Sequence, residues 1–136
     1  MKTKQREIIF NKFGGRCAYC GCELQKGWHV DHVKPVLRES EWCKTRQRFV
    51  YTGEMKFKKD DVMENKMPAC ASCNINKHSL YLEDFRKLIK GFVTSLNRDS
   101  TQYKIAKRYG LVTEEEKEVV FYFETFIEQS PSEKVK

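Results

Sequence analysis

Hydrophobic and polar residues follow recognisable periods along the first half of the chain. Three apolar side chains recur at helical spacing within residues 3–13 and two glycines follow, so we expect a helix that ends at those glycines. The stretch WHVDHVKPV (28–36) alternates and then ends near a proline, which donates no hydrogen bond to a sheet, and it predicts a strand. The stretch RFVYTGEMKFKK (48–59) predicts a β-hairpin that turns near Thr52 and Gly53.

The second half of the chain is mainly helical by the same criterion. Helical sequence starts at about Ser72, an amphipathic helix is expected over 82–96, and a short basic helix is expected over 100–110. The stretch TEEEKEVVFYFETFIEQ (113–129) opens with the Thr-x-x-Glu pattern of a capped helix. Its β-branched and aromatic centre, VVFYF, is equally typical of a strand, so the pattern leaves both alternatives open.

Length and composition narrow the class of protein. A chain of 136 residues fits one domain with a modest core, and a hydrophobic share of 40% excludes a wholly disordered chain. No apolar run is long enough to cross a membrane. The opening residues, MKTKQREIIFNKFGG, lack the apolar core and cleavage site of a signal peptide. We therefore expect a soluble, cytoplasmic protein without a membrane partner.

The net charge of +7 is unevenly distributed along the chain. Residues 114–136 hold seven glutamates against three lysines, so residues 1–113 carry +11. A basic body of this size attracts polyanions, of which nucleic acid is the commonest in cells, although a merely solvated surface is the alternative for each basic patch. The candidate contacts to a nucleic-acid backbone are Arg46, Arg48, Lys56, Lys58, Lys104, Lys107 and Arg108.

Four of the six cysteines form two Cys-x-x-Cys pairs. Two such thiolate pairs make the tetrahedral four-sulfur cage that Zn²⁺ prefers, and the 49 residues between the pairs mean that the ion would join distant parts of the chain. A redox dithiol is the rival interpretation, but no thioredoxin-like strand–helix context surrounds either pair. The expected ligands of a structural zinc ion are Cys17, Cys20, Cys70 and Cys73, which leaves Cys22 and Cys43 as free thiols.

A zinc ion at these cysteines would bring the strand 28–36 close to the helix that follows the second pair. On that helix Asn74, Lys77 and His78 fall at positions i, i+3 and i+4, one above another on a single face. With Asp31 opposite, this face would supply the oxygen ligands that suit Mg²⁺ or Mn²⁺. His32 would then remain free to act as a base.

The segments CAYC, VDHVKP and NKMPACASCNINK, in this order, resemble the HNH family of endonucleases over about residues 17–78. The resemblance implies an α+β fold with a ββα-metal (HNH) core, stapled by a four-cysteine zinc site and flanked by N- and C-terminal helices. We accordingly expect a single HNH nuclease domain over 1–136, with its core at about 14–80. A helical C-terminal extension would span about 81–129, followed by a frayed tail over 130–136.

The resemblance also implies roles for individual residues. His32 looks like the general base that takes a proton from the attacking water, Asp31 like the neighbouring metal ligand, and Asn65 like the asparagine that braces the loop. Asn74 stands where many members have a histidine, which makes the chain an HNN variant with one Mg²⁺ or Mn²⁺ ion. Three roles stay open for His78: a third metal ligand, a phosphate contact or no role. Lys77 is expected to contact a phosphate.

The function implied is that of a metal-dependent DNA endonuclease that leaves 5′-phosphate and 3′-hydroxyl ends. It would nick or fully cut double-stranded DNA, as a monomer or homodimer, in the cytoplasm of a bacterial or phage-infected cell. A non-catalytic, zinc-stabilised nucleic-acid-binding module is the alternative from a different class. RNA is a further candidate target, because hydrolysis at the phosphate does not depend on the sugar.

Overall fold

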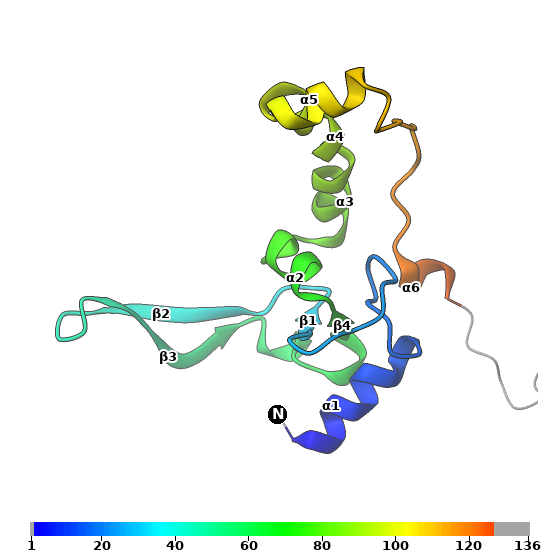
Figure 1. Ribbon diagram of the computed structural model, residues 1–136. Coiled ribbons are helices and arrows are strands. Elements are labelled where there is room, and N and C mark those ends of the chain that lie inside the picture. The colour runs from blue at the N-terminus through cyan, green and yellow to red at the C-terminus, as the bar shows by residue number, and fades with distance from the viewer. Residues whose placement is uncertain (1, 127–136) are drawn as a thin grey trace, which may run out of the picture. The chain divides into compact units, whose positions relative to one another are not determined.

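The computed structural model describes residues 2–126 and shows an α+β protein with two small antiparallel sheets. The chain separates into two compact units, Met1–Tyr81 together with Phe121–Lys136, and Leu82–Val120 (Figure 1). No helix within residues 2–126 is long and apolar enough to cross a membrane. The candidate chemistry lies in the first unit.

The first unit begins with the expected helix, α1 (Thr3–Phe10), which tightens into the 3₁₀ turn η1 (Asn11–Phe13). The helix ends at Gly14, which adopts a left-handed conformation that is unfavourable for other residues. Ile9 is fully buried, and Phe10 packs edge-on against Trp28 with ring centroids 5.4 Å apart. The predicted helix and its glycine stop are therefore confirmed.

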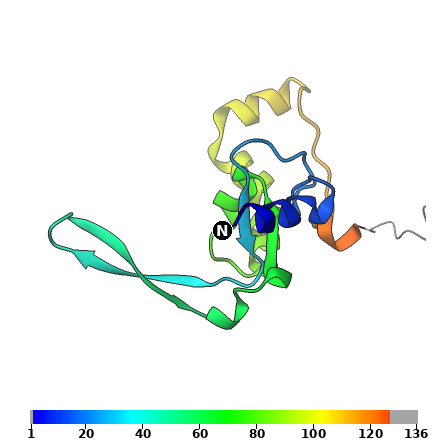
Figure 2. The same cartoon turned by 90° about the horizontal axis from the view of Figure 1, so that it is seen from below.

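The strand predicted within 28–36 is present as β1 (His29–His32). It pairs antiparallel with β4 (Lys66–Ala69), so that the two strands lie side by side and His32 is opposite Lys66 (Figure 2). The 3₁₀ turn η3 (Met63–Asn65) leads into β4. The pairing brings residues that are more than 30 positions apart to one small sheet.

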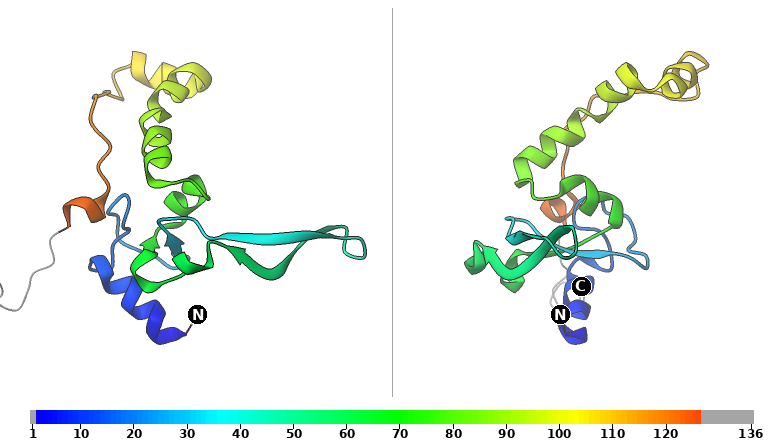
Figure 3. Two further views of the ribbon diagram at one scale, coloured as in Figure 1. Left: turned by 180° about the vertical axis from the view of Figure 1, so that it is seen from behind. Right: turned by 90° about the vertical axis from the view of Figure 1, so that its left-hand side faces the viewer.

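The predicted hairpin exists, but its turn is elsewhere. Strand β2 (Leu37–Cys43) pairs antiparallel with β3 (Arg48–Lys56), and the turn occupies residues 44–47 (Figure 3). Gly53 has a positive φ of 93° inside β3, next to an irregularity in the register. The Thr-Gly signal thus marks a bulge and not the turn, because residues 37–43 supply a partner strand that the sequence pattern did not reveal.

Helix α2 (Ala71–Lys77) begins between the two cysteines of the second pair, one residue earlier than the expected start at Ser72. The chain returns to the first unit at Phe121, whose ring is buried against Tyr19 at a centroid distance of 5.5 Å. Short helix α6 (Tyr122–Thr125) begins there, and the backbone amide of Tyr122 donates to the carbonyl of Tyr19. The core of this unit is therefore aromatic and lies beside the first cysteine pair.

The second unit contains α3 (Leu82–Lys90), α4 (Phe92–Asp99) and α5 (Thr101–Arg108). The prediction of one helix over 82–96 is wrong at Gly91, where the chain breaks between α3 and α4. The basic helix predicted over 100–110 is confirmed, and the Ser100 hydroxyl caps it by accepting from the amide of Tyr103.

For residues 113–129 the sequence left both a helix and a strand open. Over the part of this stretch that the structure describes, neither a long helix nor a strand forms. Residues 112–121 have no regular secondary structure, and only α6 is helical. Glu114 instead accepts hydrogen bonds from Asn97 and Tyr103 and pairs with Lys107. Four glutamates within 114–118 repel one another and disfavour a helix there. The predicted frayed tail, 130–136, lies outside the described residues.

Candidate metal centre and the His32 cluster

The four predicted cysteines come together in one group. Their Sγ atoms all lie within 4.8 Å of one another, and they are the one such group of three or more potential ligands within residues 2–126. One pair lies in the turn after η1 and the other lies at the start of α2, where the Cys70 sulfur accepts from the amide of Cys73. Four sulfurs at this spacing could hold a zinc ion.

Backbone packing explains why the two cysteine turns meet. The amide of Ala18 donates to the carbonyl of Pro68 at 2.8 Å, which ties the first turn to β4. Gly21 has a φ of 77°, and a Cβ atom there would lie 2.9 Å from the ring of Tyr122. The first turn therefore needs glycine both for its conformation and for its contact with the aromatic core.

Three thiols of the group, Cys17, Cys20 and Cys73, differ in their pKa. A hydrogen bond from Cys73 lowers the pKa of Cys17 to about 4, and the same bond raises the pKa of Cys73. Burial raises the pKa of Cys20 to about 12. One thiolate is thus favoured while its neighbours resist ionising beside it, and a divalent cation would supply the charge that lets all four ligate as thiolates.

Asp31 is buried on β1, and its Oδ2 atom is held by two donors. The hydroxyl of Tyr19 donates to it at 2.5 Å and the ammonium of Lys77 at 3.0 Å. Burial and the Asp31 charge raise the pKa of Tyr19, so that its hydroxyl remains a donor. In the described part of the chain Oδ1 of Asp31 makes no hydrogen bond, and no fully buried side-chain polar atom lacks a partner. Oδ1 is therefore the Asp31 oxygen that no protein donor occupies, in a residue that is 7% exposed.

Lys77, the expected phosphate contact, is buried and engaged within the fold. Its side chain is 0% exposed, and its ammonium donates to the carbonyl of His32 at 2.9 Å in addition to pairing with Asp31. A buried ammonium needs a carboxylate and further hydrogen bonds to offset its loss of hydration, and β1 supplies both. Lys77 thus joins α2 to β1.

The substitution Lys77→Ala should lower the free energy of unfolding by about 3–5 kcal/mol, because it leaves the Asp31 carboxylate buried without its cation. Urea denaturation followed by circular dichroism measures the change. Asn76→Ala on the exposed side of the same helix is the matched control, and the double variant Asp31→Asn/Lys77→Met should recover stability. Equal losses in Lys77→Ala and Asn76→Ala would contradict the ion-pair argument.

The face of α2 that carries Lys77 also carries Asn74, one turn earlier, so Asn74 lies on the helix face that packs toward β1. Asn74 is partly exposed, and its side-chain amide makes no hydrogen bond to another group within residues 2–126. His78 caps the helix: its backbone amide still donates to the carbonyl of Asn74 at 3.1 Å, one helical turn earlier. The helix ends at Lys77, and His78 is exposed with a φ of 50°.

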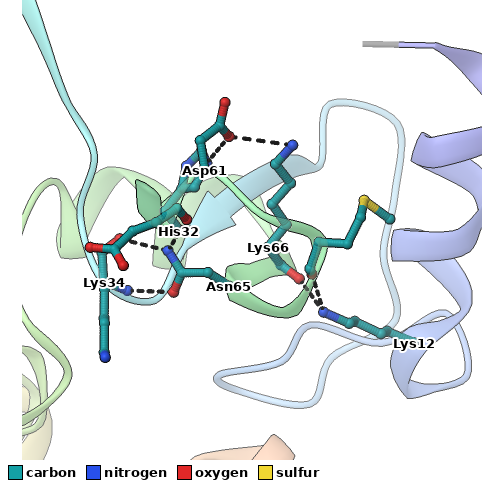
Figure 4. Close-up of polar contacts among 8 residues, drawn as sticks. Lys12, His32, Lys34, Asp61, Asn65 and Lys66 are labelled. Atoms are coloured by element: carbon teal, nitrogen blue, oxygen red, sulfur yellow. Dashed lines mark hydrogen bonds and ion pairs between the residues drawn. The ribbon is translucent and has the colours of Figure 1, made fainter. Parts of the chain in front are cut away.

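A second polar group surrounds His32, and we call His32, Asp61, Asn65 and Lys66 the His32 cluster (Figure 4). The Nε2 atom of His32 lies 2.9 Å from Oδ1 of Asp61, and the Lys66 ammonium lies 3.3 Å from the same oxygen. The hydrogen bond from His32, followed by that from Lys66, lowers the pKa of Asp61. Asp61 is therefore a carboxylate that holds the imidazole by one ring nitrogen.

Asn65 connects the two segments that carry His32 and Asp61. Its Oδ1 accepts from the amide of Lys34 at 2.9 Å, and its Nδ2 donates to the carbonyls of Lys34 and Asp60 at 2.8 and 2.9 Å (Figure 4). The Lys12 ammonium donates to the carbonyls of Met63 and Lys66, which fixes the same region to η1. The loops on both sides of the imidazole are thus tied to the fold.

Sequence reasoning missed Asp61. It belongs to no motif, lies in the irregular stretch before η3 and is 29 residues from His32. The only local signal is a pair of aspartates, Asp60 and Asp61, that follows the lysine-rich stretch 56–59. Such a pair is typical of a solvated turn, so only the folded arrangement reveals its contact.

The basic residues expected at a nucleic-acid backbone have different surroundings. Arg46, Arg48, Lys56 and Lys58 are exposed on the β2–β3 hairpin and on η2 (Lys58–Asp60), which follows it. On α5, Arg108 is exposed, Lys104 is half-buried, and Lys107 pairs with Glu114 at 3.1 Å. The hairpin therefore offers more unengaged positive charge than α5.

No model of a protein family, no curated protein and no solved structure matches this chain.

Proposed function

We propose that the protein is a metal-dependent DNA endonuclease of the HNH type, with its active site on β1, β4 and α2. The observation that carries the proposal is the His32 cluster beside Asp31. The imidazole that a carboxylate holds through one nitrogen and the carboxylate with one oxygen free of donors belong to consecutive residues at the end of β1. Antiparallel strands followed by a helix are also the arrangement that a ββα-metal core requires.

His32 is the general base in this proposal. Because Asp61 is a carboxylate, it accepts from Nε2–H, and this tautomer leaves the lone pair on Nδ1. That nitrogen can take the proton of a water that attacks a phosphodiester. Asn65 holds the backbone on either side, so the ring keeps one orientation.

The open Oδ1 of Asp31 and the unengaged amide of Asn74 fit a hard divalent cation, and these two residues would hold Mg²⁺ or Mn²⁺. When bound, the ion would neutralise charge at the phosphate and at the departing 3′ oxygen. Lys77 orients Asp31 by holding Oδ2 and so leaves Oδ1 for the ligand. The products would carry 5′-phosphate and 3′-hydroxyl ends, and His78 stays a candidate third ligand.

The cysteine group has a separate, structural role in the proposal. Four sulfur ligands leave a zinc ion no open position for substrate, so this ion would hold β4 and α2 against the first cysteine turn. The basic charge of the first 113 residues would bring the enzyme to DNA.

A plasmid assay tests the proposed function. Supercoiled plasmid incubated with the full chain should become nicked or linear with Mg²⁺ or Mn²⁺ and remain intact without added metal. Asp31→Ala and Asn74→Ala should both lose this activity, while Asn76→Ala on the same helix retains it. Retardation of the plasmid without cutting in either metal would instead favour the non-catalytic binding module. A labelled RNA of matched length shows whether RNA is a target.

Asp61 is a positioning residue for the base. The substitution Asp61→Asn keeps the shape but removes the charge that selects the tautomer, and we expect kcat for nicking to fall on the order of 10-fold with KM unchanged. Asp60→Asn is the matched control, because only the backbone carbonyl of Asp60 contacts the His32 cluster. Steady-state nicking rates over a range of plasmid concentrations separate the two constants. An unchanged kcat would show that Asp61 does not position His32.

A further inference from the structure

The β2–β3 hairpin carries aromatic side chains on one face. In the register Trp42 is opposite Phe49 and Ser40 is opposite Tyr51, so these four positions share one face of the hairpin. The alternate pairs, Glu41–Val50 and Cys43–Arg48, lie on the other face. The rings of Trp42 and Phe49 meet edge-on with centroids 5.3 Å apart. The guanidinium of Arg38 lies 5.5 Å from the ring centre of Tyr51. We call Trp42, Phe49 and Tyr51 the aromatic face.

The aromatic face is open to solvent. Trp42 is 51% exposed, Phe49 68% and Tyr51 48%. Strands β2 and β3 pair with each other and have no extensive contact with another element in the described part of the chain (Figure 1). A two-stranded hairpin with an unburied apolar face gains little stability by itself, so the exposed rings indicate a surface that a partner covers.

The charge on the hairpin selects the kind of partner. Its tip carries Lys44, Arg46 and Arg48 with no acidic residue between 42 and 53, and the three glutamates of the two strands lie further from the tip. Exposed rings next to unpaired positive charge fit nucleic-acid bases stacked on the rings and phosphates held by the arginines and lysines. Paired bases hide their ring faces within a duplex, so stacking requires unpaired bases.

We propose that the aromatic face of the β2–β3 hairpin binds single-stranded DNA by stacking unpaired bases on Trp42 and Phe49. The inference deepens the proposed nuclease function, on which its biological meaning rests. It identifies the substrate class as DNA that contains a single-stranded segment, such as a flap, gap or junction. Lys44 and Arg46, in the turn at the tip, then contact the backbone of the same strand.

Tryptophan fluorescence tests the proposal directly. The chain has two tryptophans, so Trp28→Phe in the full chain leaves Trp42 as the one reporter. A 20-nucleotide oligo-dT, added without Mg²⁺ or Mn²⁺ so that no cutting occurs, should quench this fluorescence. The apparent affinity for a 20-base-pair duplex, measured by the same quenching, should be at least about 10-fold lower. Unchanged fluorescence on saturation with oligo-dT would overturn the proposal.

A variant pair tests the face itself. Trp42→Ala/Phe49→Ala should weaken oligo-dT binding, measured by anisotropy of a labelled strand, by about 10-fold or more. Val50→Ala, on the opposite face of the same hairpin, should bind like the parent. Equal affinities for all three chains would overturn the proposal. A dimer in sedimentation that Trp42→Ala/Phe49→Ala abolishes would also overturn it, because the face would then bind a second copy.

The two proposals fail in different ways. If the Trp28→Phe chain shows quenching by oligo-dT but no plasmid is cut in either metal, the hairpin inference stands and the nuclease function fails. If plasmid is cut and the aromatic variants bind oligo-dT like the parent, the function stands and the hairpin inference fails.

Discussion

Replacing His32 by alanine should reduce metal-dependent plasmid nicking by about 10²- to 10⁴-fold, because the substitution removes the proposed general base. The loss should appear in kcat, since the imidazole acts on the attacking water and not on DNA binding. The fold should change little. Within the His32 cluster the imidazole contacts only Asp61, and in the variant the main-chain carbonyl of residue 32 still accepts from Lys77. Initial nicking rates under saturating plasmid measure the effect.

His29→Ala is the matched control for this prediction. His29 lies on the same strand, is exposed, and its side chain makes no hydrogen bond or ion pair among the residues that the structure describes. The two variants should have the same thermal midpoint within about 2 °C, so that a difference in nicking reports chemistry and not unfolding. Comparable activity of His32→Ala and the parent chain would exclude His32 as the base.

Loss of one cysteine ligand should unfold the first unit. Structural zinc contributes on the order of 10–16 kcal/mol of apparent binding free energy at neutral pH, which is as large as the roughly 5–15 kcal/mol stability of a whole domain. The first unit buries few large side chains, and the cysteine group joins its first turn to the start of α2. Cys70→Ser should therefore abolish the cooperative thermal transition and lower bound zinc from one ion per chain to none.

Circular dichroism and elemental analysis of the purified chain measure these two changes. Cys43→Ser is the matched control, because Cys43 lies on the hairpin outside the group of four and should keep both the transition and the zinc. Removal of metal from the parent chain by a strong chelator should reproduce the Cys70→Ser behaviour. A Cys70→Ser chain that retains the parent transition and its full zinc content would exclude a structural zinc at this site.

Local patterns predicted those elements whose signals are local. The helix over 3–13 has its apolar spacing and its glycine stop within a few residues, and the basic helix over 100–110 has its serine cap and closing glycine. The cysteine spacing predicted the group of four across 49 residues, because thiolate pairs have few other uses at that separation. These predictions needed no knowledge of what packs where.

Local patterns failed where a distant segment decides. The Thr-Gly signal at 52–53 became a bulge because β2 supplies a longer partner strand. The helix over 82–96 is a different case with a local cause: it breaks at Gly91, because glycine weakens a helix. The glutamate-rich stretch after 113 stays irregular because its carboxylates repel one another and Glu114 is engaged by α4 and α5.

The sequence by itself determined which residues could carry chemistry in this protein: two cysteine pairs, an aspartate next to a histidine, and asparagines at the spacing of an HNN site. Only the tertiary structure decided their surroundings. It buries Lys77 against Asp31 and gives His32 its partner in Asp61. The physical reason is that residue type and spacing fix the available donors and acceptors, whereas burial and long-range pairing fix which of them remain free for a ligand.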